Sequence, residues 1–418
     1  MDTPNDLLTE EKRREVYENQ DWAKLSPDLL RKILESLSYI DFYRAKTVCS
    51  DWYTVWKTCL KPLYPWHIIY QDDSLMLFDP REDKLYTTKV IGLSDDSYFM
   101  ASSGNWLLIV DSCLDFYIFN LVTRERINLP SMESSIHRSK SSLGDGHTVR
   151  FERSDYREYG EWGHFVEYGH FEEPCRKDHV SEDIVGCKRS AVLWIDERTG
   201  DYVVAWIFNK HYLFTYKNGD DSWRNWNSNW KSKRTNLGYL DLAYLNNKLY
   251  LYTTNDYIKI IDFSGDFPKE EIGNNPYQDL PFHYVPQECE DYWKTRIAIQ
   301  KSGEVLIILS LFEFLHEERC LFYIFKMNFE SGEWERVDSI GDDEMLIFGH
   351  GVTIRAPVQD VGDGIKNGSI CFVKDDLWPG YKSPSYCGVF DLATSRINWS
   401  KKFCFDITKS QWFAPGFA

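Results

Sequence analysis

One short pattern recurs six times along the chain of 418 residues. Each copy is a short strand that ends in an aromatic or apolar residue, followed by Asp or Asn, a turn and a second strand. The copies cover residues 74–86, 115–127, 211–223, 256–268, 321–334 and 386–399. With Phe78, Phe119, Tyr216, Ile261, Phe325 and Phe390 as anchors, the spacings are 41, 97, 45, 64 and 65 residues. The short spacings match one four-stranded blade of a β-propeller, which takes roughly 40–50 residues.

We therefore predict a mainly β chain that ends in a β-propeller of six or seven blades. Each blade is a small sheet with two apolar faces that only neighbouring blades can bury, so the ring has to close. The spacing of 97 residues leaves room for an insert or for one more blade. The apolar segment 412–417 predicts a strand that helps to close the ring. Another all-β arrangement, such as two sandwiches, is the alternative.

Composition and charge narrow the class of protein. Apolar residues make up 43% and aromatic residues 16% of the chain, which indicates a folded protein and favours strands. The net charge of −17 repels phosphate groups, so nucleic acids and anionic membranes are poor partners. The sequence contains no apolar run of about 18 residues, so we predict no membrane span.

The cysteines and the N-terminal sequence indicate the compartment. None of the ten Cys residues forms a C-x-x-C pair, and the first 20 residues are polar and acidic, without the apolar core of a secretory signal. We expect reduced thiols and a cytoplasmic or nuclear location. We also expect no cofactor.

The front of the chain differs from the rest because its pattern is helical. Ser26 is a good N-cap, Pro27 suits the first helical position, and Asp28 suits the positive end of the helix. A second helix is expected after Asp41, which can cap it. Apolar residues recur at helical spacing in both segments: Leu25, Leu29, Leu30, Ile33, Leu34 and Leu37, then Ala45, Val48, Cys49, Trp52, Val55 and Trp56.

Pro62 and Pro65 mark the end of this helical segment. The expected order is a flexible acidic tail over 1–20, a helical domain over 21–62 and the propeller over 63–418. A piece of about 40 residues is at the limit of what folds alone. It is either a helical cap that packs on the next domain or a docking module for a partner protein.

Residues 22–56 resemble an F-box. The resemblance rests on Leu25, the pairs Leu29-Leu30 and Ile33-Leu34, Leu37, and Val48-Cys49-x-x-Trp52. The family's Leu-Pro is here Leu25-Ser26-Pro27, with Pro one position later. The resemblance implies docking on a Skp-type adaptor and, through it, on a cullin–RING ubiquitin ligase. The adaptor-binding residues it implies are Leu25, Pro27, Leu29, Leu30, Ile33, Leu34, Leu37, Val48, Cys49 and Trp52.

Several later phrases are similar to the KIB-type, propeller-like domain of a large group of plant F-box proteins. They are Trp334-Glu335-Arg336-Val337, residues 340–342 and 346–348, Asn367-Gly368-Ser369-Ile370-Cys371-Phe372, Gly388-Val389-Phe390-Asp391-Leu392 and Trp412-Phe413-x-Pro415. The two resemblances together cover most of residues 22–418, and residues 130–185 lie outside them. They imply a substrate-receptor subunit whose propeller has no known catalytic activity.

One stretch suggests where a substrate protein binds. Trp226 and Trp230 lie beside the cations Lys231, Lys233 and Arg234. Exposed Trp next to cations is typical of a binding hot spot, here for an acidic substrate segment. The alternative is that these two rings pack between blades. Trp223, which follows a Gly-containing turn as Trp334 does, is expected to belong to the core of a blade.

The segment 137–182 is predicted to be a polar insert between blades. It contains four residues that could hold zinc, His164, His170, Cys175 and His179, but their H-x5-H-x4-C-x3-H spacing matches no common zinc site, so we predict no metal. No G-x-S-x-G, H-E-x-x-H, Walker loop or G-x-G-x-x-G after a strand is present.

The prediction is therefore a non-catalytic substrate receptor of an SCF-type (Skp–cullin–F-box) E3 ubiquitin ligase. The helical domain would bind the adaptor, and the propeller would bind a substrate protein. The alternatives are an F-box scaffold or competitor that acts outside a ligase and, more distantly, a propeller enzyme or lectin.

Overall fold

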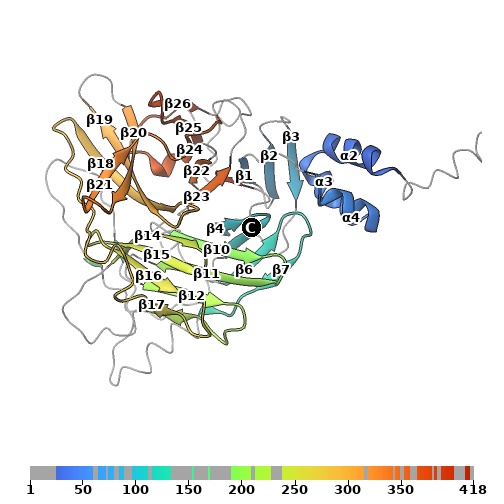
Figure 1. Cartoon of the computed structure of the whole chain (residues 1–418), viewed down its shortest axis with the longest axis horizontal. Helices are drawn as coiled ribbons and strands as arrows, with labels where there is room; N and C mark the ends of the chain where they lie inside the picture. Colours follow the sequence, from blue (N-terminus) through green and yellow to red (C-terminus); the bar gives the residue numbers. More distant parts are fainter. Residues whose placement is uncertain are drawn as a thin grey trace, which may run out of the picture. The chain divides into compact units, whose positions relative to one another are not determined.

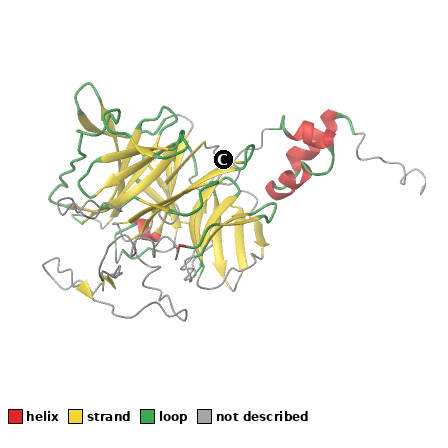
Figure 2. Cartoon of the chain, turned by 90° about the horizontal axis from the view of Figure 1, so that it is seen from below, coloured by secondary structure: helices red, strands yellow, loops and turns green. Residues whose placement is uncertain are grey.

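The computed structural model divides the chain into two compact units, Met1–Pro62 and Leu63–Ala418 (Figure 1). The helices of the first unit contrast with the strands that make up most of the second (Figure 2). The structure describes residues 25–59, 65–71, 74–79, 84–88, 97–111, 115–132, 153–154, 168–169, 190–208, 212–226, 238–314, 319–341, 344–348, 353–357, 365–378, 381–383, 387–399 and 410–414.

The helical unit consists of α2 (Pro27–Ser36), α3 (Tyr39–Ala45) and α4 (Ser50–Trp56). The start of α2 is as the sequence predicts: the Ser26 side chain accepts a hydrogen bond from the Leu29 N–H, and Pro27 is the first helical residue. The buried core of the unit is small, and it draws on all three helices: Leu30, Leu34, Phe42, Ala45 and Val55.

The expectation of a single second helix is wrong. Ser38, not Asp41, caps α3: its hydroxyl accepts from the Asp41 N–H and donates to the Asp41 carboxylate at 2.8 Å. The helix ends after Ala45, and the Thr47 hydroxyl donates to the carbonyl of Arg44. Cys49 is extended, with φ −164° and ψ 176°, so α4 starts as a separate helix.

The second unit is a six-blade β-propeller, which confirms the predicted fold. Blade 1 contains β27 (Ser410–Phe413), β1 (Trp66–Gln71), β2 (Ser74–Asp79) and β3 (Lys84–Thr88); blade 2 contains β4 (Tyr98–Ser103), β5 (Trp106–Val110), β6 (Phe116–Asn120) and β7 (Arg126–Asn128); blade 3 contains β10 (Ser190–Asp196), β11 (Asp201–Phe208), β12 (Tyr212–Lys217) and β13 (Arg224–Asn225).

The second half of the ring follows the same order, with one exception in blade 6. Blade 4 contains β14 (Tyr239–Leu245), β15 (Lys248–Thr253), β16 (Ile258–Asp262) and β17 (Lys269–Glu270); blade 5 contains β18 (Glu290–Ile299), β19 (Val305–Glu313), β20 (Arg319–Asn328) and β21 (Glu333–Val337); blade 6 contains β23 (Thr353–Pro357), β22 (Glu344–Phe348), β24 (Ser369–Val373), β25 (Cys387–Asp391) and β26 (Arg396–Trp399). Blade 6 has five strands, and β22 is parallel to β24.

The recurring sequence pattern marks one strand of every blade. The six anchors lie on β2, β6, β12, β16, β20 and β25, and each is the strand next to the outermost one. In blades 2, 4 and 6 the Asp or Asn directly after the anchor stabilises the following turn, because its side chain accepts from a backbone N–H two residues later. In blade 2, Asn120 accepts from the N–H groups of Val122 and Thr123 at 2.9 Å. In the described part of the long interval, only the short strands β8 (Arg153–Ser154) and β9 (Tyr168–Gly169) form a further pair.

Blade 1 closes the ring because it joins the two ends of the propeller. The C-terminal strand β27 pairs antiparallel with β1, with Trp66 opposite Phe413 and His67 opposite Trp412. The indole N–H of Trp412 then donates to the carbonyl of Phe372 in blade 6 at 3.1 Å. The predicted closing strand is therefore confirmed.

His67 and Cys387 meet at this closure. Both side chains are buried, and the Nδ1 atom of His67 lies 3.3 Å from the Sγ atom of Cys387. The His67 ring is 3.5 Å from the Trp412 ring, measured between centroids. Burial lowers the pKa of His67 to about 3, so the imidazole stays neutral in the folded protein.

Replacement of Trp412 by alanine tests whether this side chain stabilises the closure of the ring. We expect Trp412→Ala to lower the free energy of unfolding by about 3–5 kcal/mol. The substitution leaves a cavity and removes the hydrogen bond from the indole N–H to the carbonyl of Phe372 in blade 6. Thermal unfolding of the purified chain measures this. Phe267→Ala, at a side chain that is 68% exposed, is the control and should change stability by less than about 0.5 kcal/mol. Equal effects would show that Trp412 does not hold the ring.

The lowered pKa of His67 predicts that the protein loses stability in acid. Between its folded pKa of about 3 and the ordinary value of 6.5, the unfolded chain binds a proton that the folded chain does not. Stability from this group is therefore complete above pH 6.5 and falls as the pH drops toward 3. Melting temperatures at pH 7.0 and 4.5 should differ less in His67→Phe than in the wild type. His283→Phe, at an exposed site, should keep the wild-type difference; the same difference in all three proteins would refute the prediction.

Candidate docking surfaces

The predicted adaptor-binding residues separate into buried and accessible groups. Leu30 and Leu34 are 1% and 0% exposed, so they belong to the core of the helical unit and not to its surface. Leu29 and Val48 are 52% and 58% exposed. The others are Pro27, which is exposed, and five partly buried residues: Leu25, Ile33, Leu37, Cys49 and Trp52. A partner can therefore contact the accessible group directly, and Leu30 and Leu34 hold the helices that present it.

The helical unit also carries an aromatic patch that the sequence did not reveal. Tyr53 stacks on Trp56 with 6.2 Å between ring centroids, and Tyr43 meets the same indole edge-on at 5.6 Å. Lys57 lies 4.5 Å above the Tyr53 ring, and Lys46 lies 5.2 Å from the Trp56 ring. These ammonium groups give the patch a positive charge.

The predicted substrate-binding stretch is described only at its start. Trp223 is buried and donates to the carbonyl of Pro130 at 2.7 Å, so it is a core residue as expected. Trp226 is partly buried against the core between blades 3 and 4, and its N–H donates to the Thr215 hydroxyl at 2.8 Å. A binding role for Trp226 stays a prediction. Several predicted residues lie outside the described residues: Trp230, Lys231, Lys233, Arg234, His164, His170, Cys175 and His179.

A buried ion cluster connects blades 5 and 6. Arg296 on β18 donates from its Nε atom to Asp376 Oδ1 at 2.9 Å, and Lys294 Nζ donates to the same oxygen at 3.0 Å. The second oxygen of Asp376 accepts from the Val373 N–H at 3.1 Å. Arg296 is 1% exposed and also lies over the ring of Phe348 at 5.0 Å. These contacts fix the short 3₁₀ turn Lys374–Asp376 against β18.

The electrostatics of the cluster follow from its pairing. Burial alone would raise the pKa of Asp376, but the charges of Arg296 and Lys294 outweigh this and hold the pKa below its ordinary value. Asp241 on β14 has a raised pKa because burial outweighs the attraction of Arg296. Asp241 accepts from the Ile297 N–H at 2.9 Å and from the Ser190 hydroxyl on β10. Polar contacts thus connect blades 3, 4, 5 and 6.

Two residues after Asp376, Trp378 starts a group of rings that we call the aromatic cluster: Trp293, Phe312, Phe314, Trp378 and Tyr381. Trp378 stacks on Phe312 at 5.6 Å and 18°, and it meets Trp293 edge-on at 6.3 Å. Tyr381 and Phe314 each lie 6.1 Å from Phe312. Trp293 lies at a β-bulge in β18, and Phe314 is 47% exposed. The cluster therefore joins the exposed end of blade 5 to the loop between β24 and β25 of blade 6.

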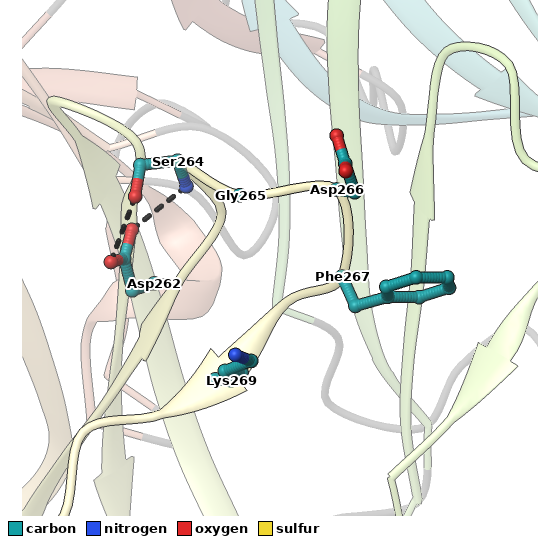
Figure 3. A pocket seen from close by; sticks show the side chains of 6 residues that line it. All are labelled: Asp262, Ser264, Gly265, Asp266, Phe267 and Lys269. Atoms are coloured by element: carbon teal, nitrogen blue, oxygen red, sulfur yellow. Dashed lines mark hydrogen bonds between the residues drawn. The ribbon is translucent and has the colours of Figure 1, made fainter.

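The turn between β16 and β17 forms a pocket of about 290 Å³, lined by Asp262, Ser264, Gly265, Asp266, Phe267 and Lys269 (Figure 3). Both carboxylate oxygens of Asp262 accept hydrogen bonds from Ser264, one from its backbone N–H at 2.8 Å and one from its hydroxyl at 2.9 Å. The carboxylate thus stabilises the turn by accepting two hydrogen bonds from the same residue.

Among the residues that the structure describes, no group of three or more His, Cys, Asp or Glu side chains could hold a metal ion. None of the helices in that part of the chain is long and apolar enough to cross a membrane.

Comparison with known proteins gives two family matches. The F-box domain family matches residues 22–63, and the KIB1-4 beta-propeller family matches residues 77–391. The chain is 62% identical to the Arabidopsis thaliana F-box protein At5g38270 and 57% identical to the Arabidopsis F-box only protein 7, over 100% of both chains in each case. It is 33% identical to the Arabidopsis F-box protein KIB4, over 86% of this chain and 84% of that protein.

We expect the loss of one negative charge from the ion cluster to destabilise the protein strongly. Asp376→Asn leaves Arg296 buried without its counter-charge, and we expect the free energy of unfolding to fall by about 3–5 kcal/mol. Denaturant unfolding measures this. Asp338→Asn, at a side chain that is 89% exposed, should change stability by less than about 0.5 kcal/mol. An unchanged free energy of unfolding in Asp376→Asn would show that the cluster does not stabilise the contact between blades 5 and 6.

Proposed function

We propose that this chain, which belongs to the F-box proteins that carry a KIB1-4 β-propeller, is a substrate-receptor subunit of an SCF-type E3 ubiquitin ligase. The observation that carries the proposal is the F-box match over 22–63, which coincides with a separate helical unit that keeps Leu29 and Val48 exposed. Apolar side chains at the surface of so small a unit favour a protein partner.

The helical unit would bind a Skp-type adaptor in two ways. Leu29 and Val48 would be removed from water at the interface, and burial of apolar surface is the dominant favourable contribution to most protein–protein association. Leu30 and Leu34 would act indirectly, because they pack the helices that position the exposed residues.

The propeller would bind the substrate protein, and the chain itself would not be catalytic. A receptor that binds adaptor and substrate at once raises the local concentration of a substrate lysine near the ubiquitin carrier. The six described cysteines, Cys49, Cys59, Cys289, Cys320, Cys371 and Cys387, form no disulfide, which supports a cytoplasmic or nuclear site of action.

An F-box scaffold or competitor outside a ligase is the second candidate. The observation that favours it is the position of Pro27, one residue later than in the F-box pattern, at the first position of α2. The same binding measurement decides between the two candidates, because a ligase receptor has to bind its adaptor.

We expect the double variant Leu29→Glu and Val48→Glu to weaken binding to a Skp-type adaptor by at least about a hundredfold. Each new carboxylate would lose its water at the interface without gaining a partner. Isothermal titration of the full chain with the purified adaptor gives the affinity, and circular dichroism confirms that the helices are retained.

Leu85→Glu is the matched control, because Leu85 is an exposed leucine on β3 of the propeller. It should bind the adaptor as the wild type does. Leu34→Asp should instead unfold the helical unit, since Leu34 is fully buried. A wild type that does not bind any Skp-type adaptor would overturn the proposal and leave the scaffold role.

A further inference from the structure

We infer that the aromatic cluster at the end of blades 5 and 6 recognises a basic residue, Arg or Lys, in an extended segment of a substrate protein. The inference rests on the proposed receptor function and gives it a surface and a chemistry. It differs from the expectation that the substrate segment is acidic, which depends on cations outside the described residues.

Two carboxylates near the start of β18, the strand that carries Trp293, are open to solvent. Asp291 is directly opposite Phe312 in the pairing of β18 with β19, so the two side chains are on the same face of the blade. Glu288 lies just before β18 and is exposed, as is Asp291. Among the residues that the structure describes, neither carboxylate has a hydrogen-bond or ion-pair partner within the chain.

The cations on the blade 5 side are already paired. Lys294 is bonded to Asp376, and Arg319 forms an ion pair with Glu313. Two lysines on the blade 6 side of the cluster are exposed, Lys374 in the turn before Trp378 and Lys382 next to Tyr381. On the blade 5 side, the exposed charges near the start of β18, those of Glu288 and Asp291, are therefore both negative.

A guanidinium or ammonium group fits this arrangement. Indole and phenyl rings attract a cation over their faces, and a nearby carboxylate adds a charge-assisted hydrogen bond. Arg suits the site best because its plane can stack on a ring while its N–H groups reach a carboxylate. An acidic segment would meet Asp291 and Glu288 with like charge.

The cluster is also held in place before any partner arrives. Trp378 follows the turn that Asp376 fixes to Arg296 and Lys294, and it stacks on the nearly buried Phe312. A rigid surface of this kind binds with little loss of conformational entropy.

The test uses the full chain bound to its adaptor and a library of immobilised nine-residue peptides in which one position at a time is fixed. For the wild type we expect peptides with fixed Arg or Lys to be enriched by about fivefold or more over the matching peptides with Gln or Glu. The double variant Asp291→Asn and Glu288→Gln should lose this preference.

The control variant is Glu330→Gln with Glu333→Gln, which removes the same charge from exposed residues at the other end of blade 5. It should keep the preference. Enrichment of acidic peptides, a flat profile, or an equal loss in both variants would overturn the inference. Since adaptor binding is measured separately on the helical unit's surface, a flat profile with adaptor binding intact contradicts only this inference, and a chain without adaptor binding contradicts the proposed function.

Discussion

The fold depends on the pairing of β27 with β1. Each blade buries its faces only against its neighbours, so an open ring would leave two blades with an uncovered apolar face. The structure meets this constraint with four backbone-paired positions, from Trp66 opposite Phe413 to Ile69 opposite Ser410. Trp412 extends the closure into blade 6, and the buried His67 and Cys387 fill the space behind it.

Features set by neighbours in the sequence could be predicted, and features set by distant contacts could not. The six-fold pattern identified the blades because the strand, the Asp or Asn and the turn are adjacent in the chain. The N-cap at Ser26 was predictable for the same reason. The split between α3 and α4 was missed because the apolar spacing continues through Cys49, whose backbone is extended.

The candidate docking surfaces show the same division. The apolar residues of the helical unit were identified from their spacing, but spacing alone does not separate Leu34, which is buried, from Val48, which is exposed. The aromatic cluster was missed because its rings come from β18, β19 and the loop after β24. A buried charge pair, Arg296 with Asp376, brings these segments together, and 80 residues separate its members in the sequence.

The position of the closing strand has a consequence for biosynthesis. The helical unit precedes the propeller in the chain and β27 follows the other strands, so α2, α3 and α4 can form during synthesis while the ring is still open. A chain that stops before residue 410 would therefore keep the helical unit but lack the strand that closes the ring. Such a product would keep the surface proposed to bind an adaptor but would lack the closed propeller proposed to bind a substrate protein.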